Sequence, residues 1–198
     1  MCIRDRRGAQ AAFGGAAKPE VGVLLARSSR GTVHSCGCSE HGRLGRPARG
    51  TWGKVLLGDE SAVSVAAADV HCLAVTQEGS LLVWGGNDRG QLGCMPGAPI
   101  EVPASVPALE GLPVAGAACS ADSTLALLAD GRVFAMGGPQ AAPPAPLPLP
   151  ARAAAVYGGG LTLGVLLTAG LPPPAAAAVA APTEGAAAAL VALSLIHI

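Results

Sequence analysis

Cys36, Cys38 and His41 are the residues of this 198-residue chain whose types and spacing come nearest to a metal site. Thiolate and imidazole groups are the ligands that zinc prefers, and a structural zinc site needs four of them. The C-x-C spacing has no second ligand pair nearby. The other cysteines are Cys2, Cys72, Cys94 and Cys119. Their spacing is not typical of a disulfide framework, so we expect reduced, structural thiols and no metal.

The remaining chemistry-bearing residues do not form a catalytic pattern. No nucleophile is paired with a general base, and no P-loop is present. We interpret His71 as a structural residue rather than as a base. The stretch Gly85–Gly93, with the sequence GGNDRGQLG, lies between predicted strands. We interpret its glycines as turn residues rather than as a phosphate cradle, and the sequence therefore predicts no catalytic residue and no cofactor.

The glycines recur at a fixed spacing. In three copies a glycine has a second glycine six residues later: Gly31 and Gly37, Gly79 and Gly85, and Gly131 and Gly137. In the first two copies the pattern continues as G-x5-G-x4-G-x-L-G. The further glycines of this pattern are Gly42, Gly45, Gly90 and Gly93. The copies lie 48 and 52 residues apart, a period typical of propeller blades or solenoid repeats, and a weaker fourth copy begins in 161–170.

Each copy is predicted to be a β-hairpin with a glycine-rich exit. In the second copy, the apolar runs His71–Thr76 and Leu81–Trp84 flank Gly79, which can take a positive φ. In the third copy, Asp130-Gly131 is a strong hairpin signal. Alternate residues of a strand point to opposite faces, and here both faces are apolar. We therefore expect neighbouring blades to cover each sheet on both sides.

Residues 66–93, with the sequence AAADVHCLAVTQEGSLLVWGGNDRGQLG, resemble the repeat of the regulator of chromosome condensation family. The residues in register with the family pattern are His71, Leu73, Gly79, Trp84, Gly85, Asn87, Gly90, Gln91, Leu92 and Gly93. Cys36 and Met136 stand where tryptophan is usual. The resemblance implies a seven-bladed propeller of four-stranded sheets, so we expect an all-β fold that is an incomplete β-propeller.

The repeats are expected at residues 20–62, 63–111 and 112–152, with a partial repeat at 153–170. Residues 1–19 are expected to be disordered or artefactual, and 171–198 to be a low-complexity tail, disordered or with a short helix. Met1–Arg6 and Ser194–Ile198 look like translated sequencing adapter, so we expect them to pack against nothing. A complete ring needs about 350 residues, which indicates a fragment of a larger protein.

Proline and glycine decide how three other segments are interpreted. The prolines at 96, 99, 103 and 107 fit an edge strand or exposed loops. Pro139–Ala151 is interpreted as a polyproline II linker or a long interblade loop. Ala153–Leu171 carries no charge, but its glycines favour a buried strand over a membrane span. We therefore expect no membrane association and a cytoplasmic or nuclear location.

Charge is distributed unevenly along a chain of zero net charge. Residues 1–54 carry ten Lys and Arg but three Asp and Glu, and 55–198 carry the reverse. The basic residues considered as a patch are Arg27, Arg30, Arg43, Arg46, Arg49 and Lys54. Such a patch would bind nucleic acid or an acidic partner. We favour solvated loop charges, because no aromatic residues are interleaved with the arginines.

Two functions follow from the resemblance. The first is a protein–protein interaction module within a larger propeller-containing protein, such as the ubiquitin ligases that carry these repeats. The alternative is a guanine-nucleotide exchange factor for a small GTPase of the Ran type. We rank it second because it requires a complete ring and specific loops. The positions expected to maintain the repeat are His71, Trp84 and the glycines at 31, 37, 42, 45, 79, 85, 90, 93, 131 and 137.

Overall fold

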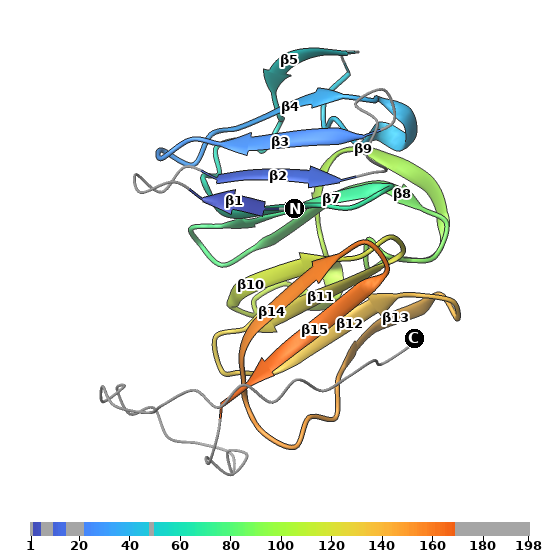
Figure 1. Ribbon diagram of the computed structural model, residues 1–198. Helices are drawn as coiled ribbons and strands as arrows, with labels where there is room; N and C mark the ends of the chain where they lie inside the picture. Colours follow the sequence, from blue (N-terminus) through green and yellow to red (C-terminus); the bar gives the residue numbers. More distant parts are fainter. Residues whose placement is uncertain (1, 5–9, 15–21, 48–49, 169–198) are drawn as a thin grey trace.

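The computed structural model describes residues 2–4, 10–14, 22–47 and 50–168, and these residues form antiparallel sheets that are stacked side by side (Figure 1). The first sheet contains β1 (Cys2–Arg4), β2 (Gln10–Gly14), β3 (Val23–Arg27), β4 (Val33–Gly37) and β5 (Gly50–Lys54). The second contains β6 (Ala62–Ala67), β7 (His71–Thr76), β8 (Leu81–Asn87) and β9 (Gly97–Ser105). Strand order follows chain order in both sheets.

The third sheet contains β10 (Val114–Cys119), β11 (Ser123–Leu128), β12 (Val133–Gly137) and β13 (Ala142–Pro146). The fourth contains β14 (Ala153–Gly159) and β15 (Thr162–Leu167). Two short 3-10 helices, η1 (Glu40–Gly42) and η2 (Pro107–Leu109), lie in the connections. In the described part of the chain the sheets do not close into a ring. The expected all-β, incomplete propeller is therefore confirmed.

The predicted hairpins are present in the three repeats. Leu24 pairs with Cys36, Cys72 with Trp84, and Thr124 with Met136, so the last residue of each pair occupies the same place in its blade. The turn glycines Gly79 and Gly131 have φ of +83° and +85°, as predicted. Each closes a tight turn, because its N–H donates to the backbone oxygen three residues earlier.

The hydrophobic core lies between the sheets. Leu82 and Trp84 of β8 belong to the apolar cluster shared with the first blade, whereas Leu81 and Val83 belong to the cluster shared with the third. Val133 of β12 packs in a third cluster, toward β14 and β15. Alternate side chains of one strand therefore serve two interfaces, which confirms that neighbouring blades cover the middle sheets on both sides.

The chain enters the fold earlier than expected. Residues 10–14 form β2, the strand of the first blade next to the second blade's β6, so the expectation of disorder up to residue 19 is wrong there. Residues 2–4 form β1, which pairs with β2. The expectation that the first residues pack against nothing is therefore wrong for residues 2–4. The sequence QAAFG did not predict a strand because it contains no β-branched residue. Gln10 secures it: its side-chain amide donates to the Val65 oxygen over 2.9 Å and accepts from the Val65 N–H over 3.1 Å.

Proline-rich segments form outer strands. The prolines at 99 and 103 lie in β9, which is the edge strand of the second blade, as predicted. Ala142–Pro146 forms β13, the edge strand of the third blade, so the interpretation of 139–151 as a linker or loop is wrong for these residues. An outer strand tolerates proline because one side of its backbone has no partner strand, and the missing N–H costs no ladder hydrogen bond there.

The uncharged segment from residue 153 is a strand pair. Ala153–Gly159 and Thr162–Leu167 pair as β14 and β15 around Gly160. Among the residues that the structure describes, no helix is long and apolar enough to cross a bilayer. The predictions for residues 169–198, including the adapter-like end and the short helix, fall outside the described residues.

Replacing Gly131 with valine is expected to lower the free energy of unfolding by more than ~1 kcal/mol, because a β-branched residue is strained at positive φ. A Cβ there would also lie 2.7 Å from the Arg152 Cβ. Gly79→Val has the same strain with less crowding, since its Cβ would lie 3.4 Å from the nearest atom. Urea unfolding followed by tryptophan fluorescence measures both.

Gly116→Ala is the matched control for these turn variants. Gly116 lies in β10, and a Cβ there has no neighbour within 4 Å. Its φ is not positive. The free energy of unfolding of the control should therefore differ from that of the wild type by no more than about 0.5 kcal/mol. Unchanged unfolding of both valine variants would contradict the turn assignment.

Candidate interaction surface at the blade junctions

A backbone hydrogen bond repeats at each junction between blades. The N–H of Ala62 donates to the Gly31 oxygen over 2.9 Å, that of Val114 to Gly79 over 2.8 Å, and that of Ala153 to Gly131 over 2.9 Å. Each bond joins the hairpin turn of one blade to the first strand of the next. The turn glycines therefore position the following blade as well as their own hairpin.

A second glycine contact repeats at two junctions. A Cβ at Gly45 would lie 2.9 Å from Nε1 of Trp84, and a Cβ at Gly93 would lie 2.9 Å from Sδ of Met136. Each glycine ends a loop that lies against the core side chain of the next blade. The residues before them, Leu44 and Leu92, are each 1% exposed. Trp84 and Met136 thus fill equivalent places with side chains of different shape.

Three other glycines predicted to maintain the repeat lie in β4, β8 and β12, at the open end of each hairpin. A Cβ at Gly37, Gly85 or Gly137 would overlap the carbonyl oxygen of Gly22, Val70 or Asp122, respectively. All ten repeat glycines, including Gly42 and Gly90, have positive φ. Each of them contacts different neighbouring residues, so they shape the backbone at separate places and line no common site.

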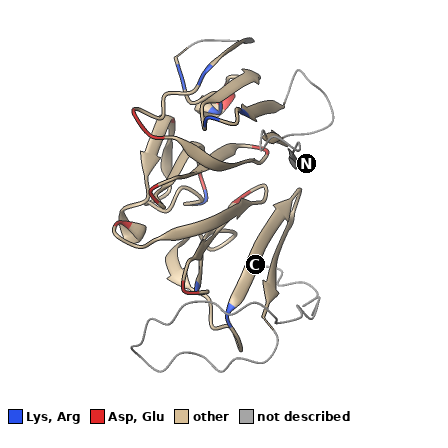
Figure 2. Cartoon of the chain, turned by 90° about the vertical axis from the view of Figure 1, so that its left-hand side faces the viewer, with Lys and Arg blue, Asp and Glu red and all other residues tan. Residues whose placement is uncertain are grey.

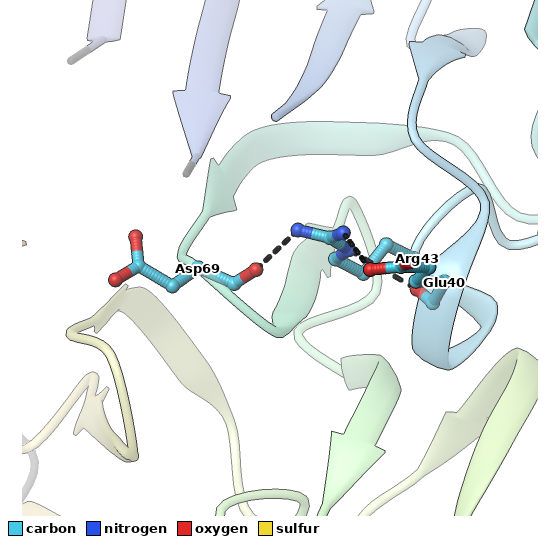
Figure 3. Close-up of polar contacts among 3 residues, drawn as sticks. All are labelled: Glu40, Arg43 and Asp69. Carbon is cyan, nitrogen blue, oxygen red and sulfur yellow. Dashed lines mark hydrogen bonds and ion pairs between the residues drawn. The ribbon is translucent and has the colours of Figure 1, made fainter. Parts of the chain in front are cut away.

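Arg43 links the first blade to the second. Its guanidinium donates to the backbone oxygen of Asp69 and, from Nε over 3.1 Å, to that of Glu40 (Figure 3). The Glu40 carboxylate lies 3.8 Å away. The Arg43 backbone oxygen accepts the Trp84 Nε1–H over 2.9 Å. Arg43 is only 3% exposed, so its charge is used inside the junction.

His71 links the second blade to the third. Thr124 Oγ1 donates to the Gln91 oxygen over 3.0 Å and lies 2.8 Å from His71 Nε2. Since a hydroxyl has one proton, His71 Nε2 must be the donor to Thr124. Nδ1 is then unprotonated, and this buried atom has no hydrogen-bond partner in the described part of the chain. Burial lowers the pKa of His71 to about 4, so the imidazole is neutral.

The described basic residues of the first repeat form no surface patch, and the favoured interpretation as solvated loop charges is wrong for three of them. Arg27, Arg43 and Arg46 are buried: Arg27 Nη1 donates to the Ala62 oxygen over 3.3 Å, and Arg46 Nη2 to the Ser35 oxygen over 3.1 Å. Arg30 and Lys54 are exposed, and Arg49 lies outside the described residues. Figure 2 shows blue and red segments interspersed over the blades. Arg27 and Arg43 therefore bond across the first junction, whereas Arg46 bonds within the first blade.

The described cysteines are not arranged as metal ligands. Cys36, Cys38, Cys72, Cys94 and Cys119 are free thiols. Burial raises the pKa of Cys72 well above its ordinary value and that of Cys119 to about 12. Within 2–4, 10–14, 22–47 and 50–168, no group of three or more His, Cys, Asp or Glu residues is arranged to hold a metal ion.

Grooves form where each hairpin turn meets the segment that enters the next blade. They measure about 230 Å³ at the first junction, about 420 Å³ at the second and about 100 Å³ at the third. We name the loops that line them the turn face. It consists of residues 32–33, 54–61, 78–81, 105–113, 130–132 and 147–152. The backbone repeats here while the side chains differ, a combination that suits selective binding.

The turn face was not predicted from the sequence. A signal was available, because the turns at Gly31, Gly79 and Gly131 hold equivalent places in consecutive repeats and must lie on the same side of the stack. The connecting segments that complete the grooves share no pattern between repeats. Their contribution therefore becomes visible only once the sheets are packed.

Comparison with known proteins identifies the repeat. Models of the "Regulator of chromosome condensation (RCC1) repeat" match residues 78–127 and 62–91. The Ultraviolet-B receptor UVR8 of Arabidopsis thaliana is 40% identical over 73 residues, which is 37% of this chain and 17% of the receptor. The human E3 ubiquitin-protein ligase HERC2 is 32% identical over 124 residues, which is 57% of this chain and 2% of the ligase.

The fold has solved counterparts. Prp20p from Saccharomyces cerevisiae, crystallised in work on its binding properties to Gsp1p and histones, superposes with a TM-score of 0.63 at 23% identity. The match covers 79% of this chain and 41% of Prp20p. The chain thus spans less than half the length of each of these three proteins.

Acidification is expected to destabilise the fold through His71. Its pKa is about 4 when folded and about 6.5 when unfolded, so the unfolded state binds the proton first as the pH falls. The contribution of His71 to the free energy of unfolding is intact above about pH 6.5 and is lost progressively toward about pH 4. The loss is about 2 kcal/mol by pH 5.

Urea unfolding of the wild type and of His71→Gln at about pH 7.5 and about pH 5 measures this effect. Glutamine can still donate to Thr124 but does not titrate, so the variant should lose less stability on acidification. Identical pH dependence in the two proteins would contradict the assigned role of His71.

Proposed function

We propose that this chain, a member of the regulator of chromosome condensation repeat family, is an interaction module that binds partner proteins on its turn face. The observation that carries the proposal is the difference between the contacts that hold the blades together and the loop residues that line the grooves. Backbone hydrogen bonds and buried side chains fix the blades, while the grooves above them are lined by different loop residues at each junction. A rigid scaffold with varied loops is how many proteins build binding surfaces.

We further propose that the module belongs to a larger propeller-containing protein associated with ubiquitin ligation. The similarity to the E3 ubiquitin-protein ligase HERC2 extends over 57% of this chain and supports this choice. The module would then select the protein that an attached catalytic domain modifies. We propose no catalysis by these repeats themselves, and a cytoplasmic or nuclear location.

Guanine-nucleotide exchange on a Ran-type small GTPase is the second candidate. The observation in its favour is the likeness in fold to Prp20p, which was studied for its binding to Gsp1p and histones. Likeness of fold alone does not carry an activity over, because one fold hosts many functions. We therefore rank exchange below partner binding.

Site-specific photo-crosslinking in cells tests the first proposal. A photoreactive amino acid at the exposed position Gln77, beside the second groove, should capture a defined partner protein. The same residue at Val102, which is 44% exposed on the outer strand β9, is the control and should not capture that partner. Equal capture from both positions, or capture from neither, would contradict binding on the turn face.

Release of labelled GDP from a Ran-type GTPase separates the two candidates. The chain should leave the release rate unchanged while crosslinking at Gln77 persists. Acceleration of release would favour the exchange function instead.

A further inference from the structure

We infer that the groove at the second junction binds a basic segment of a partner protein, with an arginine or lysine side chain inserted between Glu78 and Glu110. This inference rests on the proposed interaction function and specifies the chemistry of the partner. The groove lies between the β7–β8 turn and the segment that leads through η2 to β10. We name it the second groove.

The second groove has an apolar floor that is already formed. Leu81, Val106 and Leu109 line it and are 3%, 2% and 5% exposed, so their positions are fixed by the core behind them. The η2 turn is closed by the Leu109 N–H donating to the Val106 oxygen over 2.9 Å. The Val114 N–H bond to Gly79 ties the two walls together. A ligand therefore meets a preorganised surface, which lowers the entropic cost of binding.

The rim of the second groove is acidic and lacks a cation. Glu78 and Glu110 are both exposed, and its lining includes no Lys, Arg or His. The ion pairs found within the described residues, Glu40–Arg43 and Asp130–Arg132, involve neither glutamate. Ser105 Oγ donates to Glu110 Oε1 over 3.4 Å, which leaves that carboxylate able to accept further hydrogen bonds.

The neighbouring grooves differ from the second in charge. At the first junction Lys54 lies among the lining residues with Asp59 and Glu60. At the third, Arg132 and Arg152 accompany Asp130, and Arg132 Nε bonds the Asp130 carboxylate over 2.7 Å. Cations of this chain thus line those two grooves. The second groove combines the greatest volume of the three with uncompensated negative charge.

A long basic side chain fits these properties. Lysine and arginine bury an aliphatic stem against apolar surface while their charged group stays at the edge. The floor would hold the stem, and the two glutamates would hold the ammonium or guanidinium group. Charge-assisted hydrogen bonds of this kind are stronger than neutral ones. Nucleic acid is excluded as the occupant, because its phosphates would be repelled by the rim.

Fluorescence polarisation with the full chain and a labelled peptide, Gly-Leu-Arg-Leu-Arg-Gly, tests the inference. The wild type should bind it saturably, and the same peptide with glutamate in place of arginine should not bind. The double variant Glu78→Gln and Glu110→Gln should bind the basic peptide at least about tenfold more weakly, since it loses two charge-assisted contacts but keeps the groove's shape. Raising the salt concentration should weaken binding to the wild type.

Glu101→Gln is the matched control. Glu101 is also an exposed glutamate, but it lies on β9 outside the second groove. This variant should bind the basic peptide like the wild type. Binding by the double variant that equals the wild type, or a loss in Glu101→Gln that equals the loss in the double variant, would overturn the inference.

Crosslinking separates failure of this inference from failure of the proposed function. If the double variant still captures the same partner through Gln77 with wild-type efficiency, the second groove is not the basic-segment site, although the turn face binds partners. If the wild type captures no partner through Gln77, the proposed function fails, and this inference fails with it.

Discussion

The hydrogen bond from the first strand of one blade to the turn glycine of the blade before it is the constraint on which the rest of the structure depends. It occurs at Ala62, Val114 and Ala153. Because the acceptor is the turn glycine itself, one residue closes a hairpin and sets the place of the next sheet. The apolar clusters pack between the sheets that these bonds join. The grooves of the turn face lie directly beside these bonds.

Around this common bond, each junction is completed by different side chains. The first uses Arg43, whose buried guanidinium is satisfied by backbone oxygens and whose own carbonyl accepts from Trp84. The second uses neutral His71 through Thr124. A buried charge is tolerated only when it is paired or hydrogen-bonded, so Arg43 needs its partners, whereas His71 avoids the problem by staying unprotonated. The backbone bond is therefore the same at both junctions, although the buried side chains that complete them differ.

Much of this architecture could be predicted from glycine spacing and from Trp84, because those residues report backbone geometry that repeats. The strands β2 and β13 could not, since alanine and proline carry weak strand signals and their pairing is decided by neighbouring strands. The burial of Arg43 could not be predicted either. Arg43 holds the same place in the repeat as Gln91, and both side chains are buried. The distribution of charge along the chain does not indicate which charged side chains are buried. The second groove joins residues from two connections, so only packing reveals it.

Amide hydrogen exchange measured by NMR at Ala62, Val114 and Ala153 tests the central claim most directly. If these N–H groups are bonded across the junctions, they should exchange as slowly as amides inside the sheets, such as that of Leu73 in β7, which lies between β6 and β8 in the second blade. Fast exchange at these positions, comparable to that of the exposed Leu161, would show that the turn glycines do not hold the blades together and would contradict the account.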